Sequence, residues 1–201
     1  MQTRGWPWRA KAVPKVWGIG LTRTGTTSLN EALCHLNFEA VHWPTTSALL
    51  FGQLKAATDE SVAAVYRFLD AKHPDSRFIL TERAEQDWLV STEKHRKHNY
   101  LNVQRLLQQP DRSLTPHERA RSTEIQFTQM TLYGTVVFDE RKFLAGYHRH
   151  LDDVSRYFED RPERLLRLRI CEGEGWERLC PFLECERPRV PFPYEHRSRT
   201  Q

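Results

Sequence analysis

Small and hydroxyl-bearing residues gather between positions 20 and 28, where their types and spacing suit the binding of an anion. Gly20 and Gly25 bracket four residues, Arg23 is one of the four, and hydroxyl side chains occupy positions 26–28. In such a turn, successive backbone N–H groups point inward, and a following helix adds the positive end of its dipole. The stretch therefore predicts a phosphate-binding loop, and the alternative is an ordinary tight connection between a strand and a helix.

The loop departs from the nucleoside-triphosphate pattern G-x-x-x-x-G-K-[ST] at its cation. In that pattern the Lys reaches the β- and γ-phosphates, and the Ser or Thr holds Mg²⁺. Here Thr26 stands at the lysine position, and the positive charge lies inside the loop at Arg23. The sequence thus indicates an anion-binding loop whose positive charge lies at Arg23 and not at the usual lysine position.

Such a loop needs a strand before it and a helix after it, and the chain supplies both. Residues 16–21 are typical of a short buried strand, residues 26–36 carry apolar side chains at helical spacing, and residues 38–43 predict a second strand. A strand, a helix and a strand in this order describe a βαβ unit, which implies a parallel sheet covered by helices.

The rest of the chain continues the same alternation. Periodicity predicts one amphipathic helix over 59–72, a third and buried strand over 77–82, and a fourth strand over 165–170 whose polar alternation suits a sheet edge. Residues 45–57 carry no clear signal and are expected to be helix or loop. Helices are expected at about 115–133, with Thr115 as its cap, at 140–158, and at the segment that begins near Trp176.

The fold class predicted is therefore α/β, a P-loop-type parallel sheet of about four to five strands flanked by helices. A helical segment, about residues 105–160, lies between the third and fourth predicted strands and is expected to cover an acceptor site. The 201 residues form one domain. Residues 1–14 are expected to be a flexible basic arm, residues 195–201 a flexible tail, and the polar stretch 108–116 a loop that could act as a lid.

Composition limits the partners. The net charge is +4, but 30 Lys and Arg against 26 Asp and Glu is too balanced to indicate nucleic acid. No apolar run approaches the roughly 20 residues that span a bilayer. The four cysteines form no C-x-x-C pair. We expect reduced thiols in a cytoplasmic protein, with packing roles for Cys34 and Cys180.

The loop resembles that of a known family. Residues 21–29, Leu-Thr-Arg-Thr-Gly-Thr-Thr-Ser-Leu, are similar to the sulfotransferase loop that binds the 5′-phosphosulfate of 3′-phosphoadenosine 5′-phosphosulfate (PAPS), in particular in the bacterial branch. Arg83, at the end of the third predicted strand, and Ser91, eight residues on, resemble the pair that holds the 3′-phosphate of the donor. A guanidinium fork and a hydroxyl suit phosphate oxygens. The alternative is a surface Arg83 paired with Glu85 or Asp87 and an incidental serine.

Two late segments carry the same resemblance. Residues 175–183, Gly-Trp-Glu-Arg-Leu-Cys-Pro-Phe-Leu, and residues 190–193, Val-Pro-Phe-Pro, are similar to the end of the bacterial branch. The resemblance implies transfer of a sulfuryl group from PAPS to an acceptor hydroxyl or amine, with PAP as product and no metal. The acceptor would be a small molecule or a glycan, and the oligomeric state is left open. The residues expected to bind the donor are Thr22, Arg23, Thr24, Gly25, Thr26, Thr27, Ser28, Arg83 and Ser91.

The resemblance also points to a base. A His follows the second strand in related sequences, and His42 does so here. Because ligands lie beyond the carboxyl ends of parallel strands, His42 and Arg23 should face one crevice. An imidazole accepts protons near neutrality, so His42 is the predicted general base and Arg23 the residue that neutralises the leaving group. The alternatives are a packing role for His42, and a carboxylate base at Glu31, Glu39 or Asp59.

Two departures from the family pattern leave other functions open. Ser28 stands where many members have an aromatic residue that stacks on adenine, and the late Arg-Lys-Gly segment of animal members is missing. The rival hypotheses are a P-loop kinase or NTPase, and a non-catalytic protein of the same fold that binds PAP or a nucleotide.

Overall fold

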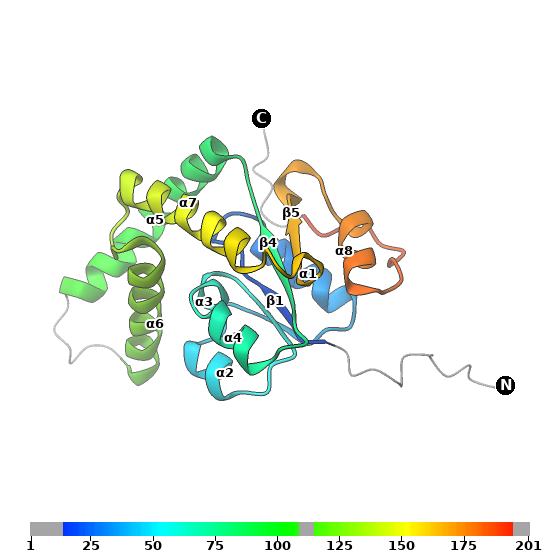
Figure 1. Ribbon diagram of the computed structural model, residues 1–201. Coiled ribbons are helices and arrows are strands. Elements are labelled where there is room, and N and C mark those ends of the chain that lie inside the picture. Colours follow the sequence, from blue (N-terminus) through cyan, green and yellow to red (C-terminus); the bar gives the residue numbers. More distant parts are fainter. Residues whose placement is uncertain (1–13, 109–114, 195–201) are drawn as a thin grey trace.

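Five parallel strands form the centre of the structure, a computed structural model that describes residues 14–108 and 115–194 (Figure 1). The strand order is β2-β3-β1-β4-β5, and every neighbouring pair is parallel. The strands are β1 Val16–Gly18, β2 Ala40–His42, β3 Ala56–Thr58, β4 Arg77–Thr81 and β5 Leu165–Leu168. The predicted α/β class with a parallel sheet is confirmed, and β5 lies at an edge as expected.

Strand β3 is absent from the sequence prediction, which expected helix or loop over 45–57. The structure instead has a short helix, α2 Thr46–Phe51, followed by β3. Three small residues give no periodic signal, yet β3 is completely buried and pairs with both β1 and β2. The first two predicted strands are therefore not neighbours, because β3 lies between them.

Successive strand residues point into two separate cores. Val16 of β1 contributes to a core with helices α1 Thr26–His35 and α8 Trp176–Leu183, whereas Trp17 contributes to the core on the other face. Figure 1 shows α1 and α8 together beside β5, with the remaining helices on the other side of the sheet. Those helices are α2, described above, with α3 Glu60–Ala63, α4 Tyr66–Lys72, α5 Glu85–Gln108, α6 Pro116–Tyr133 and α7 Glu140–Tyr157. Short 3₁₀ turns occur at Pro162–Arg164 and Ile170–Glu172.

The helix predicted over 59–72 is two helices. The chain leaves helical geometry at Val65, which has φ −127° and ψ 15°, so α3 and α4 are separate. Val62, Tyr66 and Leu69 still enter one core. The apolar spacing therefore survives the break, which explains why a single helix was predicted.

The helical segment lies between β4 and β5 and has the predicted elements. Helix α6 starts with a capping box in which Thr115 accepts from the Glu118 N–H and the Glu118 carboxylate accepts from the Thr115 N–H. Three expected segments lie wholly or mostly outside the described residues. They are the arm at 1–14, of which only residue 14 is described, the lid loop at 108–116, of which 109–114 are not described, and the tail at 195–201.

Cysteine packing agrees with prediction at one of two positions. Cys180 is buried in the core beneath α8, but Cys34 is exposed, so its predicted packing role is wrong. Helix α1 turns Leu29 and Leu33 inward and leaves Cys34 on its outer side. Of the described helices, none has the length and apolar character needed to cross a membrane.

Candidate active site

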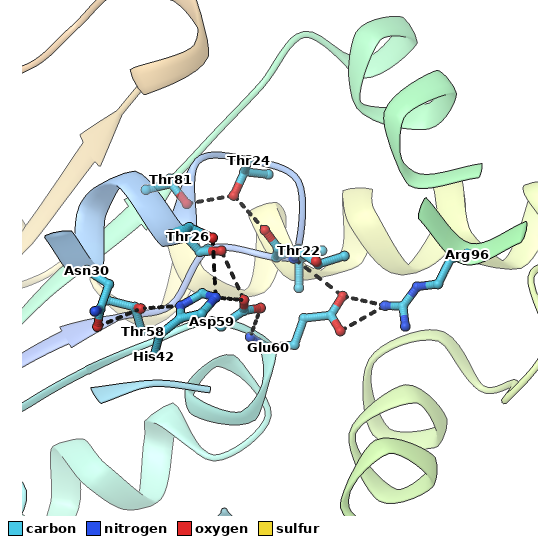
Figure 2. A network of polar contacts seen from close by, with 12 residues as sticks. Thr22, Thr24, Thr26, Asn30, His42, Thr58, Asp59, Glu60, Thr81 and Arg96 are labelled. Carbon is cyan, nitrogen blue, oxygen red and sulfur yellow. Dashed lines mark hydrogen bonds and ion pairs between the residues drawn. The ribbon is translucent and has the colours of Figure 1, made fainter. Parts of the chain in front are cut away.

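The predicted phosphate-binding loop is a tight turn held by side-chain hydroxyls (Figure 2). Thr24 Oγ1 donates to the Leu21 carbonyl at 2.6 Å and lies 2.6 Å from Thr81 Oγ1 at the end of β4. A Cβ at Gly20 would lie 1.8 Å from that same Thr81 oxygen. Gly25 has φ 103°, a left-handed conformation that favours glycine. The hydroxyl of Thr24 therefore shapes the loop. The backbone N–H groups of the loop lie at the N-terminus of α1.

Two arginines and a serine meet at this loop. Arg23 Nε donates to Ser91 Oγ at 2.9 Å, and Arg83 Nη1 donates to the Arg23 carbonyl at 3.2 Å. Partial burial lowers the pKa of Arg23, and the charge of Arg83 lowers it further. Arginine has so high an unperturbed pKa that Arg23 stays cationic. The structure thus brings together the loop cation and the Arg–Ser pair that the sequence singled out separately.

Aromatic residues hold these arginine-bearing segments in place. The Tyr147 hydroxyl donates to the Arg83 carbonyl at 2.6 Å and accepts from the Arg83 N–H at 3.3 Å. Trp88 Nε1 donates to the Thr22 carbonyl at 3.0 Å, and its ring stacks on Tyr147 with centroids 4.3 Å apart. Helices α5 and α7 therefore fix the loop and the end of β4 from one side.

His42 lies at the end of β2 with both ring nitrogens in polar contacts (Figure 2). Nδ1 is 3.0 Å from Thr58 Oγ1, which itself donates to Asn30 Oδ1 at 3.4 Å, so Nδ1 is the donor to Thr58. Nε2 is 3.1 Å from Asp59 Oδ2 and 3.3 Å from Thr27 Oγ1. Since Nε2 faces a carboxylate, a proton held at this contact is shared between the imidazole and Asp59.

Asp59 follows β3 directly and is only 6% exposed. Its φ of 97° is a strained value for a residue with a side chain, and such strain concentrates at functional sites. Its carboxylate accepts from the Glu60 N–H at 2.6 Å and from Thr26 Oγ1 at 3.0 Å. Burial raises the pKa of Asp59 and the charge of Glu60 adds to this effect, while His42 opposes it. The net effect raises the pKa of Asp59 and so favours its protonated form.

A buried ion pair lies next to Asp59. Glu60 is 4% exposed, and Arg96 Nη2 on α5 donates to both of its carboxylate oxygens at 2.9 Å. The Tyr133 hydroxyl on α6 donates to Glu60 Oε1 at 2.5 Å, and the Thr22 N–H of the loop donates to the same oxygen at 3.3 Å. One carboxylate therefore links the loop to helices α5 and α6.

Sequence reasoning missed Glu60 and Arg96. The basic run over 93–99 suggested a solvated face or the border of an acceptor site, but Arg96 is part of an internal ion pair. Trp88 and Thr92, each 0% exposed, precede it at intervals of four residues. That spacing was a usable signal that Arg96 points inward.

The two cores, the parallel order of the sheet and the loop at the start of α1 define a P-loop-type α/β protein. A family model described as "Sulfotransferase domain" matches residues 44–200. The chain therefore belongs to this sulfotransferase family. The match contains Arg83 and Ser91 and begins just after His42. No curated protein matches the chain.

Proposed function

We propose that this protein transfers a sulfuryl group from PAPS to a hydroxyl or amine of a small-molecule or glycan acceptor. The observation that carries the proposal is the meeting of Arg23, Arg83 and Ser91 at the N-terminus of α1, on the same sheet edge as the His42–Asp59 pair. Membership of the sulfotransferase family supports the reaction class.

The cationic residues fit a bisphosphorylated donor. Arg83 Nε is buried without a hydrogen-bond partner, so it retains a donor for an anion. In the part of the chain that the structure describes, neither Arg23 nor Arg83 is paired with a carboxylate, which leaves both charges for phosphate or sulfate oxygens. The backbone N–H groups of Arg23, Gly25, Thr26 and Thr27 would hold the 5′-phosphate, because those of Thr22 and Thr24 already donate to Glu60 and to the Leu21 carbonyl. Arg83 and Ser91 would hold the 3′-phosphate.

The transfer would proceed by in-line displacement. The acceptor oxygen or nitrogen attacks the sulfur, the bond from sulfur to the bridging 5′-phosphate oxygen breaks, and PAP leaves with that electron pair. Arg23 neutralises the charge that grows on the leaving phosphate. The acceptor proton passes to the His42–Asp59 pair, which must first have lost its own shared proton. His42 is thus the proposed base, with Asp59 as its partner.

Ligand binding distinguishes this function from its rivals. In a thermal-shift titration, PAP should raise the melting temperature of the wild type, and Arg83→Ala should weaken the apparent affinity about 10- to 100-fold, the effect of losing a charge-assisted hydrogen bond. Arg178→Ala, an exposed change on α8 next to Glu174, should bind PAP normally. Stabilisation by ATP·Mg²⁺ without any effect of PAP would favour a kinase or NTPase.

Transfer itself needs a second assay. Incubation with [³⁵S]PAPS and a panel of phenolic, aliphatic, amine and glycan acceptors should label at least one of them. If the protein binds PAP but no acceptor of the panel becomes labelled and no PAP is released from PAPS, the non-catalytic binding protein is favoured.

A further inference from the structure

We propose that Glu60 and Arg96 are positioning residues that set how tightly the His42–Asp59 pair holds its shared proton. This inference rests on the proposed function because it takes the His42–Asp59 pair as the base of the reaction. It concerns charges that the fold buries beside the site, and neither residue needs to touch the substrate.

The left-handed turn at Asp59 places two carboxylates side by side in the interior. Asp59 and Glu60 are consecutive, and the Glu60 N–H caps the Asp59 carboxylate at 2.6 Å. Both side chains are nearly inaccessible to water, with 6% and 4% exposure. Two neighbouring buried carboxylates repel each other, so a negative Glu60 favours the protonated form of the pair.

Arg96 counters this repulsion and is held rigidly. Besides its two bonds to Glu60, its guanidinium lies over the Phe143 ring, 5.5 Å from the centroid. With the Gln129 amide in the orientation that satisfies both of its ends, Arg96 Nη1 donates to the amide oxygen at 2.5 Å. Arg96 is thus committed to the interior, where its charge acts on Asp59 as well as on Glu60.

The groups around Asp59 act with opposite signs. His42 from β2 and the Thr26 hydroxyl from α1 lower its pKa, and Glu60 from α3 raises it. The Asp59 charge in turn raises the pKa of three groups on other elements, namely Arg23 of the loop, Arg96 of α5 and Tyr133 of α6. Because this coupling is mutual, removing Glu60 and removing Arg96 must move the proton of the pair in opposite directions.

This opposition provides the test, since loss of structure alone would not reverse the sign. Glu60→Gln keeps the shape of the side chain and removes a negative charge, so the pair should lose its proton about one pH unit lower than in the wild type. Arg96→Gln should move the midpoint upward by a similar amount. The midpoint is read from the acid limb of the transfer rate and, independently of turnover, from NMR titration of the His42 ring signals.

The buried cluster of Asp70, Arg161, Arg164 and Tyr157 supplies a matched control. It also joins a carboxylate of 4% exposure to arginines and a tyrosine hydroxyl, but near the end of α4. Asp70→Asn should lower stability and leave the His42 midpoint unchanged. If Arg96→Gln does not fold, the double variant Glu60→Gln/Arg96→Gln, which buries no unpaired charge, should return the midpoint to near that of the wild type, well above that of Glu60→Gln.

The outcomes separate the two proposals. Opposite NMR shifts without any transfer would uphold the tuning of the pair and overturn the sulfotransferase function. Transfer with no shift in the NMR midpoint of Glu60→Gln, or with shifts of the same sign for both single variants, would overturn the inference and leave the function standing.

Discussion

At the scale of single residues, the central feature is a histidine that has no free nitrogen. His42 donates to Thr58 through Nδ1 and meets Asp59 through Nε2, so its basicity cannot be separated from that of the carboxylate. Two groups coupled this closely titrate as a pair. The choice between a histidine and a carboxylate base, which the sequence left open, thus becomes a question about one shared proton.

Substitution within the pair tests its role in proton transfer. His42→Gln and Asp59→Asn should each reduce kcat by about 10²- to 10⁴-fold, the usual contribution of a general base. PAP affinity by thermal shift should change little, because neither side chain is proposed to hold the donor. The other carboxylate candidates, Glu31 and Glu39, are exposed, and Glu39 pairs with Lys55 on the surface. Glu31→Gln and Glu39→Gln therefore serve as controls, and a loss of kcat in either would move the base there.

At the scale of elements, the phosphate-binding loop depends on its close approach to the end of β4. Gly20 is required because any Cβ would overlap the Thr81 hydroxyl, and that hydroxyl in turn contacts Thr24. Loop and strand are thus built as one unit. The same strand end leads directly to Arg83, so the position of the loop and that of the proposed 3′-phosphate site are linked.

Glycine substitutions measure this dependence. Gly20→Ala should destabilise the fold by about 1–3 kcal/mol, as overpacking does in a well-packed core, and Gly20→Ala/Thr81→Ala should recover part of the loss. Gly134, at the end of α6, has φ 66°, and a Cβ added there would meet nothing within 4 Å. Gly134→Ala should therefore cost only about 1 kcal/mol, the penalty of a left-handed residue. Urea denaturation measures the free energy of unfolding of these variants. An equal loss of stability at Gly20 and at Gly134 would contradict the predicted overlap of a Gly20 Cβ with Thr81.

At the scale of the whole molecule, the sheet separates two cores, and one of them is completed by a segment close to residue 194, where the described part of the chain ends. The core against α1 and α8 is closed by Phe192, whose ring packs on Trp176 with centroids 4.8 Å apart. Trp176 Nε1 also donates to the Val190 carbonyl at 2.9 Å. The Pro-Phe-Pro segment is therefore part of the fold and not merely a family signature.

Truncation of this ring should be costly because it removes packing from a buried core. Phe192→Ala should lower the free energy of unfolding by about 3 kcal/mol, at the low end for a buried Phe because some relaxation is available at the surface. Val190→Ala, at a side chain that is 41% exposed, keeps the carbonyl and should cost less than about 0.5 kcal/mol. Urea denaturation measures both, and equal stability of Phe192→Ala and wild type would show that the segment does not close the core.

Local patterns were enough to predict much of the fold. The loop after β1, the cap of α6 at Thr115 and the edge position of β5 each follow from neighbouring residues, so they were predicted and are confirmed. Strand β3 was missed because three small residues have no pattern of their own. The break at Val65 was missed because the inward face continues through it.

The sequence by itself determined the class of protein and the presence of a tight, hydroxyl-rich turn after β1, because glycine spacing, hydroxyl runs and helical periodicity are local properties. Only the tertiary structure decided that Asp59 lies 3.1 Å from the His42 ring, and that Glu60 and Arg96 lie buried beside them. Those contacts join residues from separate strands and helices. Their energies depend on distance and on exclusion from water, and both arise only when β3 takes its place between β1 and β2.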